Sequence, residues 1–209
     1  MHFQHPAVFA YFIAQELIAK FRSFSGLQLF SKITAEYAEE RLRNLILQWV
    51  VLHVMTHVPV ELSDVVFHPD LHPGETARLI VFITELIEKD PSLLGEPSRD
   101  EFIERSVHFL AAHFLELNHI GPEQQAAIRT LLLYVNDSIQ EANLRILQGT
   151  VAIVLMDKKE LSRAIESLRN LDRDMLIGSY PLHPVRAMEF IFRFYSLEPL
   201  GEFLDEDSG

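Results

Sequence analysis

Apolar residues recur every third or fourth position along most of this chain, and no other feature of the sequence constrains the fold as strongly. Phe9 and Leu17 belong to a stripe with steps of four, which predicts a helix over residues 6–22. A second stripe, with steps of three and four, predicts a helix over residues 34–57 that Thr34 caps. Residues spaced in this way lie on one face of a helix, so every predicted helix needs neighbours that cover that face.

The same spacing continues through the rest of the chain. The β-branched residues between Thr150 and Leu155 allow a short strand over residues 150–155 as the alternative to a helix there. Further helices are expected over residues 76–87, 98–117, 122–135, 138–156, 157–168 and 184–197. The long connection over residues 58–73 either contains a short helix around residues 61–66 or has a functional role. We therefore predict an all-α fold, a single-domain bundle of about seven or eight helices over residues 1–197, followed by a flexible acidic tail over residues 198–209.

The charge of the chain is unevenly distributed. The chain has 30 acidic and 18 basic side chains, which give a formal net charge of -12. Residues 61–123 carry 13 of the acids, and the segment Glu198–Asp207 carries five. A nucleic-acid-binding protein needs a basic stripe that displaces counterions from phosphates, but the most basic stretch, residues 145–193, holds eight basic side chains among six acidic ones. We therefore expect no nucleic-acid partner.

The composition excludes several other classes of protein. The chain has no cysteine, which excludes disulfides, thiolate nucleophiles and sulfur-ligated zinc, and we expect the protein to be cytoplasmic. The most apolar run, Leu45–Val60, is interrupted by Gln48 and His53 and is shorter than the roughly 20 residues that a transmembrane helix needs. No transmembrane segment is therefore expected. Glycine-rich nucleotide-binding loops are also missing, so we expect no nucleotide cofactor.

Histidine is unusually frequent, with ten copies in the chain. His53 and His57 are four residues apart in the second predicted helix, so their side chains lie one turn apart on the same face, as pairs of metal ligands do. The angular positions of residues around this predicted helix place both histidines on an apolar face. His68, Asp70 and His72 follow a few residues downstream and could complete a metal or haem site.

Each of these histidines also has an ordinary structural interpretation. His68 and His72 both precede a proline, which is typical of a turn or of the start of a helix. His113 falls on the apolar stripe of its predicted helix, where one hydrogen bond can satisfy a core histidine. The candidate ligands for a transition metal or haem are His53, His57, His68, Asp70, His72 and His113.

Two segments are candidate interaction surfaces. The last predicted helix is apolar nearly all round, with Phe190, Phe194 and Tyr195 among its residues, which suits a central helix or one that binds a partner. Lys159 and Arg163 belong to the only cluster of cationic side chains in the sequence. Acidic residues are interspersed there, which is typical of a solvated helix face, but the cluster could also bind an acidic partner or the protein's own tail.

The leading functional hypothesis is a non-enzymatic helical interaction or regulatory protein that acts through an apolar helical face, on a protein partner or as a homodimer. The first alternative is a helical bundle that binds a metal or haem through histidines and carboxylates and works as an oxygenase or sensor. The second alternative is a carrier or sensor of a small hydrophobic ligand, held in a cavity that some of the 15 phenylalanines line.

Overall fold

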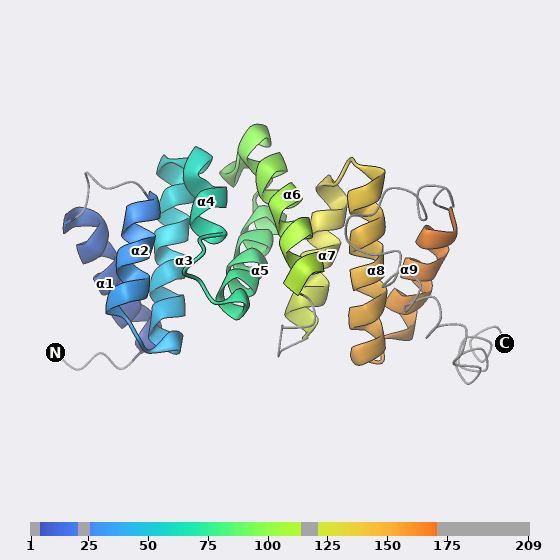
Figure 1. The fold of residues 1–209 in the computed structure, drawn as a ribbon, viewed down its shortest axis with the longest axis horizontal. Coiled ribbons are helices and arrows are strands. Elements are labelled where there is room, and N and C mark those ends of the chain that lie inside the picture. Colours follow the sequence, from blue (N-terminus) through green and yellow to red (C-terminus); the bar gives the residue numbers. More distant parts are fainter. Residues whose placement is uncertain (1–4, 21–25, 114–120, 171–209) are drawn as a thin grey trace. The chain divides into compact units, whose positions relative to one another are not determined.

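The structure is a computed structural model that describes residues 5–20, 26–113 and 121–170 (Figure 1). Every regular element within these ranges is a helix, which confirms the predicted all-α class. In the same ranges, no helix combines the length and the apolar character needed to cross a membrane. The last predicted helix and the acidic tail lie outside the described residues.

The chain divides into two compact units, residues 1–106 and residues 107–209, and each is described here by itself. The single domain expected over residues 1–197 stays a prediction. The first unit contains α1 (Pro6–Lys20), α2 (Gly26–Glu36), α3 (Glu40–His57), the 3-10 helix η1 (Pro59–Glu61), α4 (Leu62–Val66), α5 (Pro73–Lys89), the 3-10 helix η2 (Pro91–Leu93) and the start of α6 (Glu96–His113). The boundary between the two units falls within α6.

Helix α3 organises the first unit, because α1, α2, α4 and α5 all pack against it (Figure 1). Its broad apolar face includes Ile46, Leu47, Val50 and Val51, all of which are fully buried. One neighbouring helix could not cover a face of this width, so several surround it. The short helix considered near residues 61–66 is confirmed as α4.

The start of α6 is attached to α4 through aromatic and charged contacts. Phe102 is fully buried, and its ring centroid lies 6.3 Å from that of Phe67. The Arg105 guanidinium lies 5.0 Å from the centre of the Phe67 ring, and its Nη1 donates to Asp64 Oδ1 at 2.7 Å. Phe102 therefore fills core space, and the aromatic ring of Phe67 is held between a core residue and a cation.

Helix α1 packs with its small residues inward. Ala10 and Ala14 have no exposed surface and bring α1 close to α3, while the large side chains Val8 and Phe12 are about half exposed. The sequence-based prediction placed Phe9 on the inward stripe, and this is wrong, because Phe9 is 40% exposed. The alanines allow the close approach of two helix backbones, which turns the larger side chains outward.

The helix predicted over residues 34–57 is two helices, and α2 was missed. Thr34 does not cap a helix start; it lies inside α2, where its hydroxyl donates to the carbonyls of Phe30 and Ser31. The chain leaves helical geometry before Glu39, which is extended at ψ 109°. The apolar spacing runs through this break without interruption, so periodicity alone could not locate it.

The second unit contains the end of α6 and three further helices, α7 (Pro122–Tyr134), α8 (Ser138–Val154) and α9 (Lys158–Asn170). Helix α8 packs against both α7 and α9. The strand considered over residues 150–155 is wrong, because α8 continues to Val154. Val151 and Ala152 are buried and Thr150 donates to the Ile146 carbonyl. Burial on an apolar helix face outweighs the weak β-preference of these residues.

The end of α8 is closed by a Schellman motif that leads directly into α9. The Asp157 amide donates to the Ala152 carbonyl at 2.8 Å and the Met156 amide to the Ile153 carbonyl at 3.1 Å. This motif needs a left-handed residue, usually glycine, and here Met156 adopts φ +55°. Asp157 then caps α9, because its Oδ1 accepts from the Glu160 amide at 3.1 Å. A methionine thus occupies a position that favours glycine.

Replacing Met156 by glycine is expected to stabilise the second unit. The left-handed conformation costs a side-chain-bearing residue about 1–2 kcal/mol, and glycine returns roughly 0.5–1 kcal/mol of this through the entropy of the unfolded chain. We expect Met156→Gly to raise the free energy of unfolding by up to about 1 kcal/mol, measured by urea denaturation. Val154→Gly, which removes a similarly exposed side chain from the helix itself, should instead lower it. Equal losses in both variants would contradict this account.

Candidate functional site

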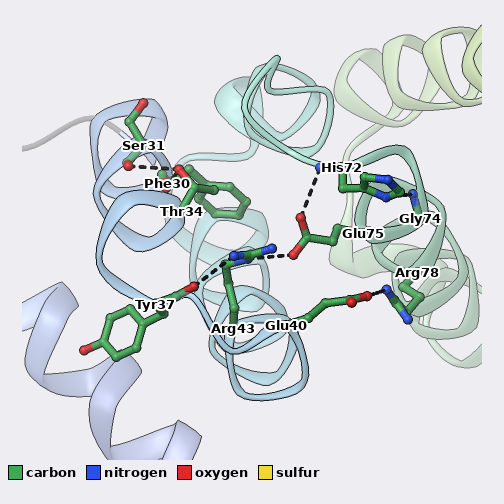
Figure 2. A network of polar contacts seen from close by, with 10 residues as sticks. All are labelled: Phe30, Ser31, Thr34, Tyr37, Glu40, Arg43, His72, Gly74, Glu75 and Arg78. Atoms are coloured by element: carbon green, nitrogen blue, oxygen red, sulfur yellow. Dashed lines mark hydrogen bonds and ion pairs between the residues drawn. The ribbon is translucent and has the colours of Figure 1, made fainter.

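A buried ion pair between α3 and α5 is the centre of the polar network shown in Figure 2. Arg43 Nε lies 2.7 Å from Glu75 Oε1, and the Glu75 side chain is only 1% exposed. Arg43 Nη1 also donates to the Tyr37 carbonyl at 2.9 Å, which satisfies a carbonyl at the end of α2. One arginine of α3 thus links the end of α2 to the start of α5.

Glu75 also completes the start of α5. Its Oε2 accepts from the His72 amide at 3.0 Å, while His72 Nδ1 accepts from the Gly74 amide at 3.2 Å (Figure 2). This reciprocal arrangement is a capping box with a histidine in the place of the usual serine or threonine. At the exposed side of the network, Arg78 on α5 pairs with Glu40 on α3. Both carboxylate oxygens of Glu75 are therefore used in fixing helix positions.

Removing the cation of the buried pair should be strongly destabilising. Arg43→Met leaves the Glu75 carboxylate buried without its counter-charge, and we expect the free energy of unfolding to fall by about 3–5 kcal/mol. Arg43→Met combined with Glu75→Gln should be less destabilising than Arg43→Met alone, because no charge remains to be buried. Denaturant unfolding measures both.

The matched control is Glu40→Gln, which breaks the exposed pair with Arg78 and should cost no more than about 1 kcal/mol. If Arg43→Met cost no more than this control, the buried pair would not have the role assigned to it.

A groove of about 660 Å³ lies beside this network, where α1 and α3 begin. Arg41, Asn44 and Arg78 are among its lining residues. Asn44 Oδ1 and Arg78 Nε are buried without a hydrogen-bond partner. The walls also include apolar residues such as Pro6 and Leu45, so the groove is a mixed surface rather than the apolar cavity expected for a hydrophobic ligand.

His53 and His57 are brought together as the sequence predicted. Their rings stack with centroids 4.1 Å apart, and His57 Nδ1 lies 2.9 Å from the His53 carbonyl oxygen. The predicted apolar surroundings apply to one of them: His53 is half-buried, whereas His57 is exposed at the end of α3. Burial lowers the pKa of His53 below its usual range, and the charge of His57 lowers it further.

This lowered pKa predicts a pH dependence of stability. The unfolded chain takes up a proton at His53 near pH 6.5, whereas the folded chain does so only at lower pH. The unfolded state is therefore favoured by protonation, so the stability that is present above about pH 6.5 decreases as the pH falls below that value. We expect His53→Gln to reduce the slope of unfolding free energy against pH between about 5 and 7. An unchanged slope in this variant would contradict the prediction.

The other candidate ligands serve local structure. His68 is buried, its Nε2 lies 3.0 Å from the Ser31 hydroxyl, and its Nδ1 accepts from the Asp70 amide at 3.2 Å. His72 caps α5, and the ring of His113 lies against Phe109, with centroids 4.5 Å apart. Among the described residues, no three or more His, Asp or Glu side chains are grouped as a metal site requires. The six candidates thus lie as separate pairs and single residues.

A second buried carboxylate, Glu160, organises charge in the second unit. Its side chain is 4% exposed and accepts from Gln148 Nε2 at 2.7 Å and from Arg163 Nη1 at 2.6 Å. Arg129 of α7 also approaches it, with Nε 3.6 Å from Glu160 Oε2. The sequence suggested that Glu160 lies among the basic residues on a solvated face, but its side chain turns inward.

The cap of α9 is part of the same arrangement. The pKa of Asp157 is lowered, mainly because its carboxylate accepts from the Glu160 amide and also because Gln125 Nε2 donates to it at 3.0 Å. Asp157 is therefore negatively charged, and its hydrogen bonds connect α7 to the start of α9. A sequence signal for this exists, since aspartate three residues before glutamate at a helix start is typical of a cap.

The predicted interaction residues are placed only in part. Phe190, Phe194 and Tyr195 lie outside the described residues. Lys159 is exposed on the first turn of α9, and Arg163 is half exposed although it contacts Glu160. The exposed apolar residues of α1 and of the end of α8 were not predicted as surfaces, because apolar periodicity does not show which face of a helix is covered.

Comparison of the chain with known protein families, with curated proteins and with solved structures gives no match.

Proposed function

We propose that this chain is a non-enzymatic, all-helical interaction protein that binds a protein partner through the exposed apolar face of α1. The partner is another protein or a second copy of the chain. The observation that carries this proposal is the outward position of four large apolar side chains, Val8, Phe9, Tyr11 and Phe12, in the first two turns of α1.

The arrangement of α1 suits a binding surface better than an ordinary surface helix. The buried residues of α1 are Ala10, Ala14 and Leu17, so the large apolar residues of its first two turns contribute less to the core than their size allows. Tyr11 is oriented by an edge-to-face contact with Trp49 of α3, with ring centroids 4.9 Å apart, and by a similar contact with Phe12. Ordered aromatic side chains lose little conformational entropy on binding and are common anchors of protein interfaces.

The rest of the helix supports this interpretation. The exposed residues of the later turns include Gln15, Glu16 and Lys20, so the outward apolar surface is confined to the first two turns and has a polar edge. An apolar centre with a polar rim is the usual composition of a protein–protein interface. We therefore assign the first two turns as the contact region.

Site-specific photo-crosslinking tests the proposal. A benzoylphenylalanine at position 8 should crosslink to one defined protein or to a second copy of the chain, and Phe12→Glu should weaken this crosslink about tenfold or more, because loss of a central aromatic anchor costs about 2 kcal/mol. Glu88, which is exposed on α5, provides the control position for the photo-reactive group.

Sedimentation velocity over a wide concentration range separates the two kinds of partner, because a second copy would raise the sedimentation coefficient with concentration. A monomeric chain whose crosslinking at position 8 does not exceed that at position 88 would overturn the proposal.

A further inference from the structure

The junction of α8 and α9 combines two exposed apolar side chains with a local excess of positive charge. Met156 is 75% exposed and Val154 is 54% exposed. Lys159, Arg129 and Arg163 are exposed close to the same junction, and both arginines contact a single buried carboxylate, that of Glu160. We call Val154, Met156, Arg129, Lys159 and Arg163 the junction patch.

The positively charged residues of the junction patch come together only in the folded chain. In the sequence, Arg129 is about thirty residues from the basic cluster of α9, but the hydrogen bond between Gln125 and Asp157 fixes the start of α7 beside the start of α9. Two carboxylates lie beside the two arginines, because Glu160 turns inward toward both of them and Asp157 also interacts with Arg129, so Lys159 supplies the excess of positive charge. The junction patch is thus cationic within a chain whose net charge is -12.

Met156 adds an independent observation. It occupies a left-handed position that glycine adopts without strain, yet it carries a long side chain of which most is exposed. The fold gains little from this side chain, because glycine would close α8 equally well. A strained residue that does not serve the fold is a sign of a functional contact. Methionine is a common residue in adaptable binding surfaces.

We propose that the junction patch binds the acidic carboxy-terminal segment of this same chain, residues 202–207. This segment, Glu-Phe-Leu-Asp-Glu-Asp, places an apolar pair between acidic residues, so its composition complements the patch in both charge and hydrophobicity. Phe203 and Leu204 would cover Met156 and Val154, and the carboxylates would lie near Lys159 and the two arginines.

The length of the chain allows this contact. Helix α9 has 13 residues and is therefore about 20 Å long, while 31 residues separate its last residue, Asn170, from Glu202. A connection of that length can span several times the length of α9. Because the acidic segment is tethered to the same chain, its effective concentration at the junction patch is high, and it would compete with any other acidic sequence for this patch.

The cysteine-free chain permits a direct test in the full-length protein. A nitroxide on Ser208→Cys should broaden the methyl NMR signal of Met156, which is assigned by its loss in Met156→Leu. Lys159→Glu, and separately neutralisation of Asp205, Glu206 and Asp207 to amides, should each reduce this broadening several-fold. Sodium chloride at about 0.5 M should reduce it as well, because salt screens the attraction between exposed charges.

Lys89→Glu makes the same charge change at an exposed lysine of α5 and should leave the broadening unchanged. To test whether the segment binds within one molecule, spin-labelled chain without isotope is mixed with isotope-labelled chain that has no cysteine and no spin label. No broadening of the Met156 signal is expected in this mixture. Broadening that is absent, that is insensitive to Lys159→Glu, or that arises only between molecules would overturn the proposal.

Discussion

The first unit depends on the need to cover the broad apolar face of α3. An α-helix satisfies its own backbone hydrogen bonds, so its position in a protein is decided by the side chains that it must remove from water. In α3 these side chains extend over a face too wide for one neighbour, and α1, α2, α4 and α5 all contribute cover. The breaks between these short helices follow from this requirement, because each segment must approach the same helix from another direction.

Buried ion pairs then fix the relative positions of helices that apolar contacts alone would leave adjustable. Arg43 with Glu75 in the first unit and Arg163 with Glu160 in the second place a carboxylate inside the protein near the start of a helix. Each carboxylate has more than one hydrogen-bond donor, which compensates for its removal from water. Apolar faces can slide along one another at small cost, whereas these groups have one arrangement that satisfies them all.

The sequence predicted the class of fold and most helices, because apolar spacing and prolines at helix starts are local signals. It could not locate the break between α2 and α3, since the spacing runs through it. It also left a strand near Thr150 open as the alternative to a helix, because local preference ignores burial. For the candidate surfaces, the sequence identified Lys159 and Arg163. It could not show that Glu160 turns inward or that Arg129 joins them, because both depend on contacts between helices distant in the chain.

The double use of Glu75 has a consequence for the way the first unit opens. The same carboxylate closes the first turn of α5 and holds the guanidinium that satisfies the end of α2. Fraying of α5 at its first residues would therefore leave the Arg43 guanidinium without its carboxylate partner between α3 and α5. It would also weaken the hydrogen bond that satisfies the carbonyl at the end of α2. The ordinary, low-energy loosening of a helix end is unavailable at this position, so the three helices should lose their structure as one cooperative unit rather than singly.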